Sequence, residues 1–122
     1  MQLRQEKGVG PFIDAYQGNM FKVDGKVYQN SILVRAEQQV QNWSPANLAA
    51  VTATDVQEII VLKPTLVLFG TGEHNIFFIA ELLAPLYAAK IGVEVMDTIA
   101  ACRTYNVLMS EGRDVLAALL LK

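Results

Sequence analysis

Cysteine and histidine are almost absent from this sequence of 122 residues, which contains one of each, Cys102 and His74. A single cysteine excludes an internal disulfide and a cysteine-based zinc site. The sequence also lacks a cluster of histidines and carboxylates at metal-ligand spacing, and it lacks a recognisable pair of nucleophile and base. We therefore expect no metal, no cofactor and no catalytic residues. These absences favour a protein that is not an enzyme, although they leave an enzymatic activity open.

An excess of positive charge is missing too. Ten lysines and arginines stand against twelve aspartates and glutamates, which gives a net charge of −2 at pH 7. A protein whose main role is to bind nucleic acid neutralises phosphates with clustered basic side chains. The charge balance therefore argues against nucleic acid as the partner.

A long apolar run without charges is also missing. The longest apolar stretch, from Ile76 to Val93, contains Glu81, Pro85 and Lys90, and an acidic residue inside a bilayer costs about 3 kcal/mol. The first ten residues lack the apolar core of a secretory signal. We therefore expect a cytoplasmic protein without membrane insertion.

Apolar residues make up 52% of the sequence, enough to fill the core of one domain over residues 1–122. Leu66–Phe69 and Val93–Met96 are short, rich in branched side chains and bounded by turn residues, as strands buried on both faces are. About a helix's worth of sequence separates them, so we predict neighbouring parallel strands joined by a helical crossover. A polar turn follows each strand, the glycine loop Gly70–Asn75 after the first and Asp97-Thr98 after the second. Both turns then lie at one edge of the sheet, where α/β sheets form a binding crevice.

The first half of the chain contains the signal of a β-hairpin. Asp24-Gly25 is a pair preferred in two-residue hairpin loops, because both residues take a positive φ there. We predict strands over residues 20–23 and 26–34 on either side of this pair. A strand over residues 11–16 precedes them, and a short strand over residues 38–43 follows.

Helix signals follow the hairpin. Ser44-Pro45 is typical of a cap followed by proline at the first helical position. The stretch from Thr54 to Gln57 matches a capping box that opens a helix ending near Leu62. Later, apolar spacing predicts a helix that begins close to Leu82 or bends at Pro85.

The sequence predicts the last helix clearly but leaves the C-terminal segment ambiguous. Thr98 is placed to cap a helix whose apolar face contains Ala101, Tyr105 and Leu108, and Gly112 is placed to end it. Residues 115–121 fit either a helix or a third buried strand. Pattern alone does not decide between these two alternatives.

Hydrogen-bonding groups gather around the two polar turns. Glycines in the first turn let a ligand approach the backbone closely and present N–H groups to an anion. The candidate ligand-binding residues are Gly70, Thr71, Gly72, Asp97, Thr98, Arg103, Thr104 and Asn106. The same groups can instead cap the helix and tie it to the glycine loop, because buried polar groups must be satisfied with or without a ligand. In that interpretation Arg103 or Arg113 pairs with Glu111 or Asp114.

Cys102 lies one turn into the helix predicted to begin at Thr98. The helix dipole is expected to lower the pKa of a thiol there somewhat. No histidine base is near it in the sequence, so we interpret Cys102 as a small buried residue. We interpret His74 as a surface histidine of the glycine loop.

The order of several motifs resembles a known family, the Mth-type domain of unknown function. The resemblance is carried by Leu66–Gly72, Ile91–Thr98, Ala100–Asn106 and Glu111–Arg113, and upstream by Tyr28, Ser31 and Trp43. It therefore covers nearly the whole chain.

The resemblance implies a three-layer α/β domain with a central mixed sheet, helices on one side and a β-hairpin layer on the other. It also implies that residues 115–121 form a strand. The family brings no established catalytic residues, and its best-known eukaryotic members act through other proteins as assembly or regulatory factors. We therefore expect a non-enzymatic factor with a protein partner. Since the sequence shows no mitochondrial presequence, a bacterial-type stand-alone domain is the expected form.

The alternative function is binding of a small molecule, such as an anionic nucleotide-like or redox ligand. It would use the crevice between Gly70–Gly72 and Asp97–Asn106. A homo-oligomer is a further hypothesis, motivated by the high apolar fraction and by edge strands in the hairpin layer.

Overall fold

The computed structural model describes residues 10–73 and 80–122, and within these ranges the strands form two sheets. The central sheet has five strands in the order β5-β4-β8-β6-β7. These strands are β4 (Ile32–Arg35), β5 (Gln41–Asn42), β6 (Leu66–Gly70), β7 (Gly92–Met96) and β8 (Val115–Leu119). The second sheet is antiparallel and consists of β1 (Ile13–Tyr16), β2 (Phe21–Val23) and β3 (Lys26–Tyr28).

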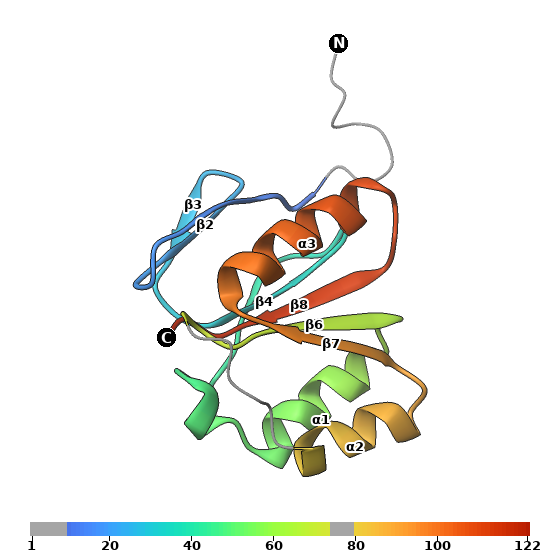
Figure 1. Cartoon of the computed structure of the whole chain (residues 1–122). Helices are drawn as coiled ribbons and strands as arrows, with labels where there is room; N and C mark the ends of the chain where they lie inside the picture. Colours follow the sequence, from blue (N-terminus) through green and yellow to red (C-terminus); the bar gives the residue numbers. More distant parts are fainter. Residues whose placement is uncertain (1–9, 74–79) are drawn as a thin grey trace.

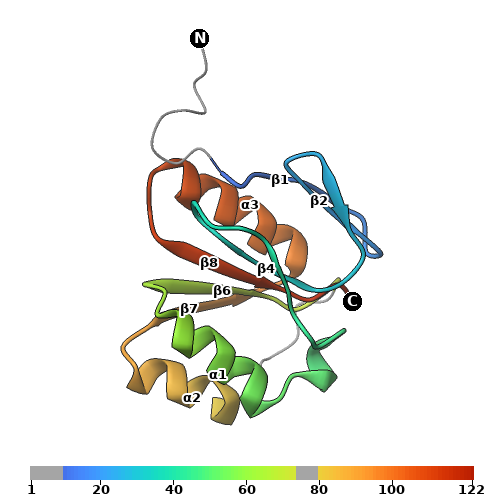
Figure 2. The same ribbon diagram turned by 180° about the vertical axis from the view of Figure 1, so that it is seen from behind.

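The elements are arranged in three layers around the central sheet (Figures 1 and 2). The helices α1 (Ala53–Leu62) and α2 (Ala80–Ala88) cover one face. The three-stranded sheet covers the other face and shares it with α3 (Thr98–Ser110). The predicted α/β class, the mixed central sheet and the hairpin layer are confirmed. The helices do not all lie on one side, however, because α3 shares the face of the hairpin layer.

Parallel pairing in the middle of the sheet is confirmed. β6 pairs in parallel with β7 on one side and with β8 on the other, while β4 pairs antiparallel with β8, so the sheet is mixed. Residues of β8 alternate between the two apolar clusters, with Leu119 on the α3 side and Leu120 just beyond it on the α1–α2 side. Burial on both faces explains why this segment reads as one continuous apolar run.

The predicted hairpin is present, since Asp24 and Gly25 have φ values of 47° and 82° between the antiparallel strands β2 and β3. The prediction of one strand over residues 26–34 is wrong. The chain leaves the outer sheet after β3 and enters the central sheet at β4. Ser31 fixes the segment that passes from one sheet to the other. Its carbonyl accepts a hydrogen bond from Trp43 N at 2.8 Å, and its hydroxyl accepts one from Leu121 N at 2.9 Å.

The predicted capping box is two residues out of register. Thr52 caps α1, since its hydroxyl accepts from Asp55 N at 3.3 Å and the Asp55 carboxylate accepts from Thr52 N at 2.8 Å. An aspartate takes the place of the longer acidic or amide residue that the usual pattern has. The helix ends at Leu62 as predicted, followed by Lys63 in the left-handed region with φ 53°.

Two other predicted caps are also wrong. A short 3₁₀ helix, η2 (Leu48–Ala50), is capped by Asn47, whose side chain accepts from Ala50 N at 3.1 Å, and not by Ser44. The cap of α3 is Asp97, whose carboxylate accepts from Ala100 N at 2.8 Å. Thr98 is the first residue of that helix, and its hydroxyl serves another purpose.

The burial of β7 and α2 is less complete than their apolar composition suggests. Val95 is half-buried, because β7 is an edge strand of the central sheet. Tyr87 on α2 is 58% exposed, whereas Leu83 and Leu86 are buried. Pro85 lies inside α2, and this helix includes Ala80, which precedes the start predicted near Leu82.

Asp114 is paired with Arg35 rather than with Arg103 or Arg113. Two guanidinium nitrogens of Arg35 donate to its two carboxylate oxygens at 2.9 and 3.0 Å. The hydrogen bond from Arg35 is the main cause that lowers the pKa of the Asp114 carboxyl, and Thr65 N–H adds to it. Arg35 also donates to the carbonyl of Leu62 at 2.6 Å, so this pair joins the end of α1 to the start of β8.

We expect the stabilisation from the Asp114 carboxylate to be complete above about pH 4 and to decrease progressively below it. Because its pKa is lower in the folded state than in the unfolded chain, where it is about 3.9, the stabilisation is lost as pH falls through the lowered value. Asp114→Asn should lower the free energy of unfolding by about 0.5–1 kcal/mol at pH 7, since the pair is partly exposed. Urea unfolding at pH 7 and pH 3 measures this. Glu58→Gln, which removes the charge of an exposed carboxylate on α1, is the control. A loss that is equal at both pH values, or that Glu58→Gln also causes, contradicts the prediction.

Candidate functional site

The carboxyl ends of β6 and β7 are the topological switch point of the central sheet. The chain continues from β6 towards α2 on one face and from β7 into α3 on the opposite face (Figure 1). Strands whose connections diverge in this way usually leave a crevice between their carboxyl ends. The structure therefore brings the two predicted turns to the same edge, as their spacing suggested.

Backbone hydrogen bonds close this crevice. Thr71 N donates to Met96 O at 2.9 Å, and Thr98 N donates to Gly72 O at 2.8 Å. The hydroxyl of Thr71 also donates to Met96 O, at 3.2 Å. These bonds join the loop after β6 to the loop after β7, so the N–H groups of Thr71 and Thr98 already have partners.

Thr98 is the centre of this joint. Its side chain is fully buried, and its hydroxyl accepts from Gly72 N at 2.8 Å while it donates to Leu120 O at 2.9 Å. A Cβ on Gly70 would lie 2.9 Å from that hydroxyl oxygen. Gly72 has a φ of +93°, and a Cβ there would lie 2.4 Å from the carbonyl carbon of Lys122. The two glycines therefore make room for neighbouring parts of the chain.

Asn106 and Thr104 are also engaged within the fold. The Asn106 amide oxygen accepts from Ile13 N at 2.9 Å, and its amide nitrogen donates to Ile13 O at 2.8 Å. Asn106 thus binds the backbone of β1 as a neighbouring strand would. The hydroxyl of Thr104 lies 3.5 Å from the sulfur of Met96.

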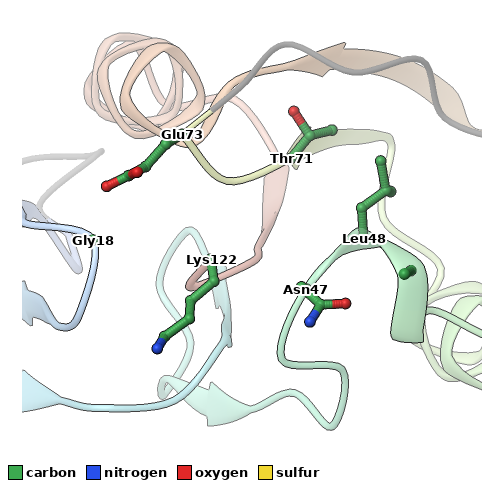
Figure 3. Close-up of a pocket in the computed structure, with 7 residues that line it drawn as sticks. Gly18, Asn47, Leu48, Thr71, Glu73 and Lys122 are labelled. Atoms are coloured by element: carbon green, nitrogen blue, oxygen red, sulfur yellow. The ribbon is translucent and has the colours of Figure 1, made fainter.

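Three of the eight predicted residues border two separate cavities. Thr71 lies at a cavity of about 550 Å³, with Glu73, Lys122, Gly18 and the η2 turn around it (Figure 3). In Figure 3 the Glu73 side chain points towards the Gly18 turn, and Leu48 lies on the side of Thr71. Sequence reasoning missed Asn47, Leu48 and Lys122, because each comes from a distant part of the chain without a local motif.

Arg103 and Asn106 line the second cavity, of about 250 Å³, between α3 and β1. Cys102 lies at its base and is buried, as predicted. Burial, and then the nearby Asp97 carboxylate, raise the pKa of the Cys102 thiol to about 12, contrary to the lowering expected from the helix dipole. Desolvation by burial and the charge of Glu73 similarly raise the pKa of Tyr16 to about 12. At neutral pH this cavity therefore offers a protonated thiol and no anionic nucleophile from these groups.

Within residues 10–73 and 80–122, no three histidine, cysteine or acidic side chains are grouped so as to hold a metal ion. His74 lies outside the described residues. No helix in the described ranges has the length and apolar character needed to cross a bilayer.

Comparisons with known proteins agree with this fold. The bovine NADH dehydrogenase (ubiquinone) 1 alpha subcomplex assembly factor 3 is 31% identical to the chain over 97% of the chain and 65% of its own length. The chain thus spans just under two thirds of that relative. The 13 kDa major membrane protein of Francisella tularensis is 26% identical over 94% of the chain and 95% of its own length.

A solution structure of a Bordetella pertussis protein, described as a Mth938-like domain, gives a TM-score of 0.80 at 31% sequence identity. The alignment covers 90% of this chain and 85% of that chain. A family model described as protein of unknown function (DUF498/DUF598) matches residues 13–120. The chain is therefore a Mth-type α/β domain and belongs to the family of proteins of unknown function DUF498/DUF598.

Proposed function

We propose that this protein binds another protein and acts as a non-enzymatic factor of the assembly type. The observation that carries the proposal is the internal use of the polar groups at the switch point, where Thr98 and Asn106 bond the backbone of their own fold. A reaction centre needs groups free to bind substrate or to exchange protons. The relation to a bovine assembly factor for NADH dehydrogenase supports the same proposal.

Deletion of the corresponding gene in the organism that carries it tests this function. We expect a loss of fully assembled NADH dehydrogenase on native gels and an accumulation of smaller subcomplexes. Both effects should be reversed when the wild-type chain is expressed again. Unchanged levels of the assembled complex and of its precursors would reject the assembly role.

A small-molecule site remains the second candidate, and the cavity of about 550 Å³ beside Thr71 favours it. Glu73 and Lys122 give this cavity one group of each charge, and its size suits a small ligand. Native mass spectrometry of the purified protein tests this candidate. A bound species of constant mass that is lost on denaturation supports it, and a spectrum of the bare chain alone argues against it.

Two further parts of the proposal concern the cellular location and the oligomeric state of the protein. We propose a cytoplasmic location, which cell fractionation with an antibody to the chain tests. We also propose that edge strands allow a homo-oligomer. Light scattering between 1 and 100 micromolar, a range chosen to cover typical weak dimers (about 10⁻⁶–10⁻⁴ M), tests it, and a mass that stays at one chain throughout rejects it.

A further inference from the structure

The outer side of α3 has an unusual composition. Ile99, Arg103 and Val107 are spaced four residues apart and are exposed, so they form one stripe along the helix. Ile99 is 46% exposed and Val107 is 55% exposed. A solvent-facing helix side usually carries several charged residues, but Arg103 is the one charged residue among the thirteen of α3. The stripe is therefore one cation between two branched apolar side chains.

Arg103 differs from Arg35 in its contacts with the described part of the fold. Its guanidinium makes no hydrogen bond or ion pair with the residues that the structure describes, whereas Arg35 is held by Asp114 and by two carbonyl groups. The interpretation that Arg103 ties α3 to its own loop finds no contact to support it. As far as residues 10–73 and 80–122 are concerned, the five donors of this charged group are therefore available at the surface.

A groove runs beside the stripe, between α3 and β1. Its volume is about 250 Å³, and Ile99 and Arg103 stand on its α3 side while Asp14 and Tyr16 stand on its β1 side. The walls are held in place, since Asn106 bonds the backbone of β1 and the Tyr16 hydroxyl donates to Leu121 O at 2.7 Å. The Asp14 carboxylate accepts from Gly25 N at 2.8 Å, so the acid of the groove has a partner of its own.

We propose that this surface, the α3 groove formed by Ile99, Arg103, Val107 and the cavity against β1, binds a segment of a partner protein that presents one carboxylate between apolar side chains. A guanidinium binds a carboxylate through two parallel hydrogen bonds, which fixes orientation as well as charge. Apolar neighbours that exclude water strengthen such a contact, and arginine is enriched at the centres of protein interfaces. The inference rests on the proposed function, because it names the surface through which the factor holds its partner.

Two other occupants fit this surface less well. A second copy related by a two-fold axis would place the stripe against itself, with Arg103 near Arg103 and no acidic residue on α3 to pair it. An anionic membrane surface attracts a single basic residue only weakly, and the stripe carries one. A partner segment with its own carboxylate is the occupant that complements the charge.

Selection of random peptides displayed on phage against the purified full-length chain tests the chemistry. We expect enriched peptides with an aspartate or glutamate flanked by apolar residues. Arg103→Glu should enrich peptides with a lysine or arginine instead, because the charge of the groove is reversed. Lys90→Glu makes the same change of charge on an exposed residue next to α2 and should enrich the wild-type motif.

The enriched peptide then allows a quantitative test. Fluorescence anisotropy should show that Arg103→Ala weakens its binding at least about tenfold, as expected for loss of a charge-assisted pair. Ile99→Ala combined with Val107→Ala should also weaken it. The melting temperature should stay within about 2 °C of the wild type, because surface substitutions usually change stability very little.

Complementation of the deletion strain separates this inference from the proposed function. If wild type and Lys90→Glu restore assembled complex and Arg103→Glu does not, both are supported. If all three restore it, the assembly role stands and the α3 groove is wrong. If the deletion has no effect, the assembly role fails, and the peptide selection alone then decides the groove.

Four results overturn the α3 groove. They are a wild type that enriches no motif, the same acidic motif for Arg103→Glu, a concentration-dependent dimer that Arg103→Glu abolishes, and binding to anionic phosphatidylserine vesicles that depends on Arg103. The last two would assign the surface to a second copy and to a membrane, respectively.

Discussion

Replacing Leu68 with alanine should lower the free energy of unfolding by about 2–4 kcal/mol. Leu68 is the middle residue of β6, which is flanked on both sides by strands, and its side chain is fully buried in the cluster that contains Tyr105 and Leu119. Alanine removes apolar contacts and leaves a cavity that rigid neighbouring strands cannot fill. Urea unfolding followed by circular dichroism measures the loss.

Val95→Ala is the matched comparison. Val95 lies opposite Phe69 in the parallel register, but it belongs to the edge strand and is half-buried. We expect a loss of about 1 kcal/mol, since only part of the removed surface was shielded from water. Equal losses at Leu68 and Val95 would contradict the arrangement in which β6 is central and β7 is at the edge.

Local patterns were sufficient to predict most of the central sheet. Leu66–Gly70 and Gly92–Met96 are short branched runs separated by a crossover, and such runs pair in parallel because a right-handed connection returns the chain beside its start. The Asp24-Gly25 turn was equally readable, since it depends on the φ preferences of two adjacent residues. In both cases the deciding interactions lie within a few residues or repeat along one element.

Patterns failed where distant segments decide the structure. The break between β3 and β4 depends on Ser31, whose hydroxyl binds the backbone of Leu121, ninety residues away in the sequence. The edge position of β7 depends on the order of the strands in the sheet, and the sequence of one short strand does not determine that order. The prediction of the α1 cap was wrong for a local reason. Thr52 and Asp55 form the capping box, and the aspartate side chain is shorter than the glutamate or glutamine of the usual pattern.

The two predicted turns lie at the same edge of the sheet, and hydrogen bonds between them use several of the candidate residues within the fold. Spacing put Thr98 and Gly72 at the same edge, which the structure bears out. Spacing alone does not tell whether a hydroxyl there faces a ligand or a neighbouring backbone group, since both uses require the same residue type. Arg103 lines the cavity between α3 and β1, and within residues 10–73 and 80–122 no acidic side chain forms an ion pair with it. Whether these residues bind a ligand stays a prediction.

Thr98→Val should lower the free energy of unfolding by about 2–3 kcal/mol, because a buried N–H and a buried carbonyl lose their partner. The Thr98 hydroxyl is fully buried and bonds both Gly72 N and Leu120 O. Valine has nearly the shape of threonine, so the substitution removes these bonds with little change in volume. A methyl group also cannot stay 2.8 Å from the Gly72 nitrogen, and the loop after β6 must shift. Urea unfolding measures the loss in stability.

Thr98→Ser is the control, since it keeps the hydroxyl and removes one buried methyl group, at a cost of about 1 kcal/mol. If serine destabilises the protein as much as valine does, packing rather than hydrogen bonding holds this joint.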